Sequence, residues 1–212
     1  MRKNKHVFSA LLVLILTLNS CIGISMDINM NTDGSGKINL EYRVSRLLDS
    51  LGAFDGNQSM PVIPVGLQDW QRTVDRIPGL KIASFKTAEN NNDFVTNLVL
   101  NYENPQALVM FLGENSFIDM DKRQLEYIIK SDIEDIDDNL KMMMRNIFID
   151  YNFSISFSAS GNSAITIIDK NGNTVIPPSQ AEVTSSGRKT SFSINTMDLI
   201  ELPTILGLRF NW

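Results

Sequence analysis

Side-chain oxygens recur at every second position from Asn29, in the stretch NMNTDGSGKINLE, and this spacing could supply ligands to a calcium ion. An EF-hand loop needs oxygen ligands at positions 1, 3 and 5, a glycine at position 6 and a bidentate glutamate at position 12. The first four requirements are met when Asp33 stands at position 5, but Leu40 then stands at position 12 and Glu41 comes one residue too late. The stretch is therefore a poor calcium loop, and its flanks favour a hairpin turn.

Five acidic residues form the densest charge cluster of the chain and could bind a divalent cation or supply a carboxylate pair for glycoside hydrolysis. They are Asp132, Glu134, Asp135, Asp137 and Asp138. On a helix they would occupy the polar face of the first two turns, and Lys141 and Arg145 would follow toward the C-terminus. This order complements the helix dipole, so we interpret the cluster as a solvated helix face.

Asp119 and Asp121 share one face of an expected strand and could also ligate a cation. Lys122 and Arg123 follow at once and can neutralise both carboxylates. We therefore interpret this pair as part of an ordinary surface turn.

The chain contains a single histidine, His6, and a single cysteine, Cys21. His6 lies in an N-terminal segment with the features of an export signal, and Cys21 follows that segment directly. Without another imidazole or thiol, the remaining chain cannot build a Ser-His-Asp triad, a Cys-His pair or an imidazole-ligated zinc site. The sequence thus predicts a protein that is not an enzyme and holds no metal or cofactor. Carboxylate, Ser/Lys or metal-carboxylate chemistry is the narrower enzymatic alternative.

The N-terminal segment, residues 1–20, starts with three basic residues and continues with an apolar run from Val7 to Leu18. A permanent transmembrane helix needs about 20 apolar residues to cross the hydrocarbon core, so this shorter run is typical of a cleaved export signal. Leu18-Asn19-Ser20-Cys21 then resembles the lipobox of bacterial lipoproteins. The resemblance implies that Cys21 is acylated and becomes the first residue of the mature chain.

Acylation of Cys21 would place the protein on a membrane without any membrane-spanning helix. Each buried CH₂ contributes about 0.8 kcal/mol, and two acyl chains already give stable anchoring. We therefore expect residues 21–212 to form a single domain, tethered on the extracytoplasmic side of a membrane of the bacterial cell envelope. The alternative for Cys21 is a buried or unpaired thiol, since a lone cysteine cannot form an internal disulfide.

The charge of the chain argues against one class of partner. The expected signal holds three of the 19 Lys and Arg residues and none of the 24 Asp and Glu residues, so the mature chain would carry a formal charge of −8. An acidic surface repels phosphate backbones, and nucleic acid is not an expected partner.

Period-two alternation predicts that the stretch from Asn29 lies in a β-hairpin. Apolar residues alternate with polar ones on both sides of the turn, at Ile22, Ile24, Met26, Ile28 and Met30 and again at Ile38, Leu40, Tyr42 and Val44. The turn Thr32 to Gly36 carries glycines that can adopt positive φ. The first strand would begin directly after Cys21, so a lipidated chain would lie close to the membrane headgroups.

This arrangement resembles the LppM-like domain of bacterial lipoproteins. The resemblance is carried by Cys21, the strand Ile22 to Met30, the turn Asp33-Gly34-Ser35-Gly36 and the strand Lys37 to Ser45. It implies an α+β domain that binds envelope lipids or glycolipids. The sequence departs from the family pattern by ending in an aromatic strand instead of a transmembrane helix.

The remaining apolar spacing predicts helices and strands in alternation. Helices are expected at residues 44–54, 67–77, 105–112 and 131–147, the last opened by a capping box at Ser131 and Glu134. Strands are expected at 80–87, 94–102, 117–121, 125–130 and 151–157, around Phe192 and at 206–212, with an Asn-Gly turn at 171–172. Tight turns cannot join parallel neighbours, so we predict an α+β fold with a mostly antiparallel sheet and amphipathic helices on one face.

Several side chains could contact a lipid. Met143 and Met144 lie on the apolar stripe of the last helix, which favours a place in the core, whereas Met142 lies off the stripe and is the better ligand contact. Trp70 and Trp212 lie on apolar patterns that favour packing. A turn at Arg188 and Lys189 could touch anionic headgroups.

The leading functional hypothesis is a non-enzymatic envelope lipoprotein, held to the membrane through Cys21, that binds a lipid or glycolipid in an apolar cleft. The alternative is a protein-protein interaction module of an envelope complex, docking through an apolar patch or a strand edge. A cavity that could accept an acyl chain would favour the first hypothesis.

Overall fold

The computed structural model describes residues 22–46, 66–90, 92–129, 145, 150–169, 171–202 and 205–212. Several predicted features lie outside the described residues. They are Cys21 and the lipobox residues Leu18, Asn19 and Ser20, the helix expected after residue 46, the acidic residues of 132–138, and Met142, Met143 and Met144.

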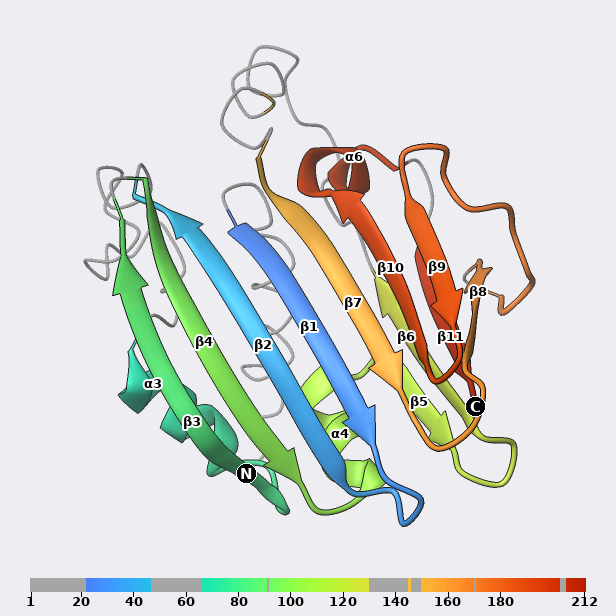
Figure 1. Cartoon of the computed structure of the whole chain (residues 1–212), viewed down its shortest axis with the longest axis horizontal. Coiled ribbons are helices and arrows are strands. Elements are labelled where there is room, and N and C mark those ends of the chain that lie inside the picture. The colour runs from blue at the N-terminus through green and yellow to red at the C-terminus, as the bar shows by residue number, and fades with distance from the viewer. Residues whose placement is uncertain are drawn as a thin grey trace, which may run out of the picture.

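The larger of two sheets in the described part of the chain has seven strands in the order β3-β4-β2-β1-β7-β10-β9. Its strands are β1 (Ile22–Met30), β2 (Gly36–Ser45), β3 (Leu80–Glu89), β4 (Asp93–Tyr102), β7 (Asn152–Ser158), β9 (Glu182–Ser186) and β10 (Lys189–Asn195). Neighbours are antiparallel except β1 and β7, which pair in parallel with Ile24 opposite Phe153. This pairing joins the two halves of the chain in one sheet (Figure 1).

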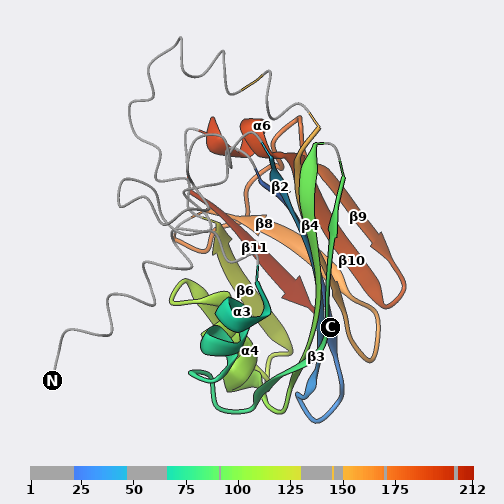
Figure 2. The same ribbon diagram turned by 90° about the vertical axis from the view of Figure 1, so that its left-hand side faces the viewer.

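The smaller sheet has four strands in the order β5-β6-β11-β8, and all its neighbours are antiparallel. They are β5 (Ser116–Asp119), β6 (Gln124–Ile129), β8 (Ala164–Ile168) and β11 (Leu206–Asn211). Figure 2 shows this sheet beside one face of the larger sheet. Phe157 of the larger sheet packs between the layers, with its ring centroid 5.5 Å from that of Phe210 and 5.0 Å from that of Trp212.

The helices of the described residues are short. They are α3 (Leu67–Val74), α4 (Pro105–Leu112) and α6 (Thr196–Ile200). The predicted start of α4 is confirmed, since the Asn104 side chain accepts a hydrogen bond of 2.9 Å from the backbone N–H of Ala107 and Pro105 occupies the first turn. α3 ends at Val74, before the predicted residue 77.

The predicted α+β fold with mostly antiparallel strands is confirmed at this coarse level, but the expectation of a single sheet was wrong. The strands that include Phe117, Leu125 and Phe210 pair with one another and form a second sheet that packs on the first. Alternating apolar side chains show that one face of a strand is buried, but they do not show which sheet the strand joins. The pattern alone therefore cannot assign these strands to a sheet. Val44 also lies in β2 and does not begin a helix.

The predicted hairpin of β1 and β2 is confirmed, with Ile22 opposite Val44 and Met30 opposite Gly36. Gly34 has a φ of 82° in the turn, which L side chains rarely adopt. Ile28 of β1 and Ile38 of β2 are cross-strand partners on one face of the hairpin, and both are fully buried. The alternation that predicted the strands is therefore the alternation between core and solvent.

The face of the larger sheet that points away from the core is polar. Ser154 and Ser193 face each other across β7 and β10 with their hydroxyl oxygens 2.7 Å apart, and Ser156 donates a hydrogen bond of 2.8 Å to the carboxylate of Asp27. An antiparallel-rich sheet that buries one face and solvates the other has this division of side chains.

Candidate functional site

In the turn that resembled a calcium loop, side-chain oxygen atoms form hydrogen bonds within the turn. Asp33 Oδ1 accepts hydrogen bonds from the hydroxyl and the backbone N–H of Ser35, at 2.7 and 3.0 Å. The bond from the Ser35 hydroxyl is the main cause that lowers the pKa of the Asp33 carboxyl. Among the described residues no group of three or more His, Cys, Asp or Glu side chains is placed to hold a metal ion. The turn therefore closes a hairpin.

Asp119 also serves a turn, as expected. Its Oδ1 accepts the backbone N–H of Lys122 at 3.0 Å, and its Oδ2 lies 3.1 Å from Lys122 Nζ. The backbone hydrogen bond from Lys122 is the main cause that lowers the pKa of the Asp119 carboxyl. Asp121 is exposed in the same turn.

Three of the four aromatic and basic side chains considered for lipid contact pack or pair within the protein. Trp70 is buried against Tyr42, edge to face, with ring centroids 6.4 Å apart. Trp212 packs on Phe157. Lys189 Nζ lies 3.4 Å from the carboxylate of Asp27 in the neighbouring part of the sheet, while Arg188 is exposed. The expected packing of both tryptophans is confirmed.

A groove of about 780 Å³ lies beside α6 and is a candidate binding site in the described part of the chain. Ligand pockets for small molecules commonly have about 300–1,000 Å³. The groove is lined by Arg145, Asp169, Val175, Ile176, Pro178, Gln180, Asp198, Glu201, Leu202, Ile205 and Leu206. Apart from Arg145, these residues come from α6 and the two residues after it, from the connection between β8 and β9, and from the start of β11 with the residue before it.

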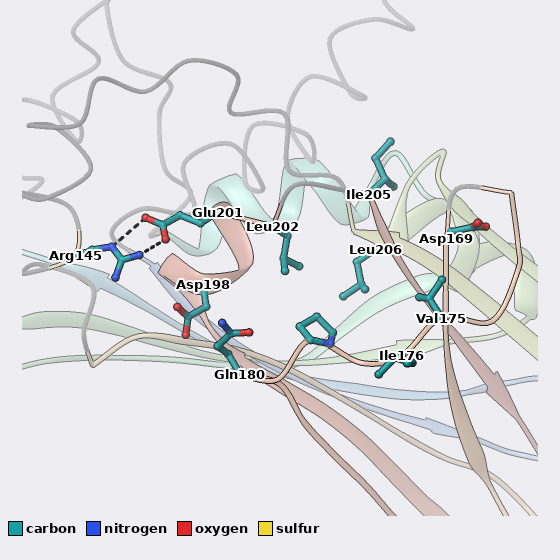
Figure 3. A pocket seen from close by; sticks show the side chains of 11 residues that line it. Arg145, Asp169, Val175, Ile176, Gln180, Asp198, Glu201, Leu202, Ile205 and Leu206 are labelled. Atoms are coloured by element: carbon teal, nitrogen blue, oxygen red, sulfur yellow. Dashed lines mark hydrogen bonds and ion pairs between the residues drawn. The ribbon is translucent and has the colours of Figure 1, made fainter.

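The side chains of the groove divide into a polar end and an apolar end. Figure 3 shows Arg145, Glu201, Asp198 and Gln180 at one end and the apolar residues beyond them. The apolar end carries Val175, Ile176, Leu202, Ile205 and Leu206. Ile176 is 92% exposed and stands at the rim, whereas Leu206 is buried in the wall.

The polar end is organised by an ion pair. Arg145 donates Nε–H to Glu201 Oε1 over 3.1 Å and binds the second carboxylate oxygen through its NH2 group. The hydrogen bond to Glu201 is the main cause that raises the pKa of the Arg145 guanidinium, and the field of Asp198 adds to it. Asp198 and Glu201, three residues apart, project from the same side of α6 and its end.

Asp169 lies at the far end of the groove and belongs to the β8 turn. Its Oδ1 accepts the backbone N–H groups of Asn171 and Asn173 at 2.8 and 2.9 Å, and its Oδ2 accepts the Asn173 amide at 3.1 Å. The backbone bond from Asn173 is the first cause that lowers the pKa of this carboxyl. The predicted Asn-Gly turn is thus confirmed, and its acid holds the loop that forms one wall.

The helix α6, which lines the groove, lies at the end of the larger sheet where β1 begins (Figure 1). Tyr151 contacts both β1 and α6. Its ring would be 3.3 Å from a Cβ added at Gly23 of β1. The carbonyl oxygen of Tyr151 accepts the backbone N–H of Thr196 at 2.9 Å and the Asn195 amide at 3.1 Å. Thr196 is the first residue of α6, so the start of β1 and the groove lie at the same end of the larger sheet.

Sequence reasoning missed this groove and its residues. The available signal was the segment Val175-Ile176-Pro177-Pro178, an apolar pair followed by two prolines in a connection between strands. Exposed apolar residues in a rigid connection often line a binding surface. The partners Asp198 and Glu201 gave no local signal, because the tertiary structure alone brings them to this loop.

Comparisons with models of protein families, with curated proteins and with solved structures find no match to this chain. Among the described residues no helix is long and apolar enough to cross a membrane.

Proposed function

We propose that this protein is a non-enzymatic lipoprotein of the bacterial cell envelope, anchored through acylated Cys21, that binds a lipid or glycolipid in the groove beside α6. The observation that carries the proposal is the groove itself, with about 780 Å³ and a wall that includes Val175, Leu202 and Leu206. Its size and mixed lining suit a ligand with an apolar body and a polar head.

The position of the groove supports the proposal independently of its size. A lipidated Cys21 would hold the start of β1 at the membrane surface, and α6 lies at that end of the sheet. A lipid leaving the bilayer would then have a short path to the rim at Ile176. An apolar side chain that is 92% exposed is stabilised when it contacts hydrocarbon instead of water.

We further infer that the amphipathic helices complete the layer begun by the smaller sheet, on one face of the larger sheet. Trp70 of α3 and Leu108 of α4 are buried and support this inference. α3 and α4 lie on the same side of the larger sheet as the smaller sheet (Figure 2).

Photocrosslinking in intact cells tests lipid binding. Cells that produce the full chain are fed a fatty acid with a photoreactive group, irradiated, and the tryptic peptides are analysed by mass spectrometry. We expect lipid adducts on the peptides covering residues 171–188 and 190–209, which contain most of the groove. Leu202→Trp, which narrows the groove, should lower these adducts severalfold, while Leu67→Trp on the exposed side of α3 should not.

Two outcomes would contradict lipid binding in the groove. One is the absence of lipid on both peptides although the chain is abundant in the cells. The other is an equal yield of adducts in the Leu202→Trp and parent chains, because a ligand seated in the groove must respond to its volume.

The anchor is tested separately by the full chain carrying Cys21→Ser. We expect this variant to leave the membrane fraction or to accumulate with its signal uncleaved, and the parent chain to carry an acyl mass on Cys21. A parent chain with an unmodified Cys21 would remove the anchor from the proposal.

A second candidate function is docking on another envelope protein. The observation that favours it is Phe117, which is 55% exposed on β5, an edge strand of the smaller sheet. Exposed aromatic side chains on strand edges are common protein contacts. A photoreactive residue in place of Phe117 should capture one reproducible protein in intact cells, and a probe at Leu67 serves as the matched control. Crosslinking at position 117 that gives no discrete protein product would count against docking.

A further inference from the structure

The headgroup that the groove accepts follows from the charges at its polar end, and this inference rests on the proposed lipid-binding function. Two carboxylates, Asp198 and Glu201, stand around one guanidinium, Arg145. Asp169 adds a further negative charge at the far end, where it is held by the β8 turn. The described residues of the lining therefore carry three negative charges and one positive charge.

Arg145 is the one cation among the described residues of the lining, and it is already paired with Glu201. Arg145 directs its Nε–H and one NH2 hydrogen at the carboxylate of Glu201, so a ligand anion reaches only the remaining N–H groups, next to that carboxylate, unless it displaces Glu201. Displacement would leave a partly buried carboxylate without its partner, which costs more than an ordinary hydrogen bond. The side chain of Glu201 is only 26% exposed, so water cannot fully replace the guanidinium.

Asp198 differs from Glu201 in its relation to the cation. It acts on Arg145 through its field, while Glu201 takes the direct hydrogen bonds. Asp198 is half-buried and faces the groove beside Gln180, at the border with the apolar residues (Figure 3). A cationic group placed there could pair with Asp198 while an attached hydrocarbon chain lies along Leu202 and Leu206.

We propose that the groove selects an amphiphile with a protonated amine in its headgroup over one with an anionic headgroup. The amine donates hydrogen bonds to the carboxylate of Asp198, and the apolar chain occupies the end lined by Val175, Leu202 and Leu206. Arg145 stays bonded to Glu201 and repels a second cation from the end of the groove. The pattern of charge thus fixes the orientation as well as the class of ligand.

Three photoreactive probes with the same alkyl chain test the selection, with the full chain held in uncharged maltoside micelles. One probe ends in a primary amine, one in a carboxylate and one in an uncharged sugar. We expect the amine probe to label residues 190–209 about tenfold more than the carboxylate probe, because a hydrogen bond to a charged group contributes this much to binding. In Asp198→Asn the difference should fall to about twofold or less.

A matched variant separates a local contact from the overall negative charge of the protein. Asp121→Asn removes the same charge from an exposed turn outside the groove and should keep the preference for the amine probe. An unchanged preference in Asp198→Asn, or equal labelling by amine and carboxylate probes, would overturn the headgroup assignment. If the sugar probe still labels the groove after either of these results, the headgroup assignment fails but lipid binding is retained. If no probe labels the groove, the proposed lipid-binding function fails as well.

Discussion

The hydroxyl of Tyr102 donates a hydrogen bond of 2.9 Å to the carbonyl oxygen of Asn29, 73 positions earlier in the chain. Asn29 lies near the end of β1, and Tyr102 is the last residue of β4, two strands away in the sheet. The bond passes over Gly36, which is opposite Tyr102 in the pairing of β2 and β4. It therefore ties three strands together at the hairpin end of the larger sheet.

Gly36→Ala should destabilise the protein, because there is no space for a side chain under this bond. A Cβ at position 36 would lie 2.0 Å from the carbonyl oxygen of Asn29 and 2.4 Å from the Tyr102 hydroxyl. We expect the free energy of unfolding to fall by about 3 kcal/mol, at the upper end for overpacking. Urea unfolding followed by circular dichroism measures the change. Gly66→Ala, where the nearest atom would be 3.4 Å away, should cost less than about 1 kcal/mol.

Tyr102→Phe and Tyr42→Phe should have opposite outcomes although both hydroxyls are buried. Removing the Tyr102 hydroxyl leaves the Asn29 carbonyl without this donor, so stability should fall by about 1–2 kcal/mol. The Tyr42 hydroxyl has no hydrogen-bond partner within the described part of the chain, so its removal should be neutral or stabilising. Thermal unfolding of both variants compares them. Equal losses would mean that the Tyr42 hydroxyl is bonded in solution.

Phe157→Ala should be among the most damaging single changes. Phe157 is fully buried and joins the two sheets through Phe210 and Trp212. Loss of a buried phenyl ring typically costs about 3–5 kcal/mol. Phe117→Ala removes the same ring from an exposed site and should change stability by less than about 0.5 kcal/mol. The denaturant midpoints of the two variants check this expectation. Equal shifts of both midpoints would contradict the two-layer packing.

Stability should decline above pH 10 through Tyr127. Burial raises the pKa of this phenol from its ordinary value of 10.0 to about 12. Below pH 10 the phenol is neutral in both the folded and unfolded chains and has no effect. Between pH 10 and about 12 the unfolded chain releases the proton first, so unfolding becomes more favourable. Urea midpoints measured from pH 8 to 11.5 should fall less steeply in Tyr127→Phe; an unchanged slope would show that Tyr127 titrates normally.

The sequence by itself determined the local elements of the described chain. Alternation around the Asp33-Gly34 turn gave both strands of the hairpin, and Asn104 with Pro105 marked the start of α4. These signals work because periodicity, turn conformation and helix capping depend on residues a few positions apart. The presence of Cys21 after an apolar run is local in the same way, and it remains the basis of the predicted anchor.

Only the tertiary structure decided how distant strands combine. β1 pairs in parallel with β7 across more than a hundred residues, and Tyr151 connects the start of β1 with α6. Side-chain alternation states which face of a strand is buried but not which strand or layer covers it. The groove arises from that choice, since Asp198 and Ile176 line one groove only after β10 and β11 have joined different sheets.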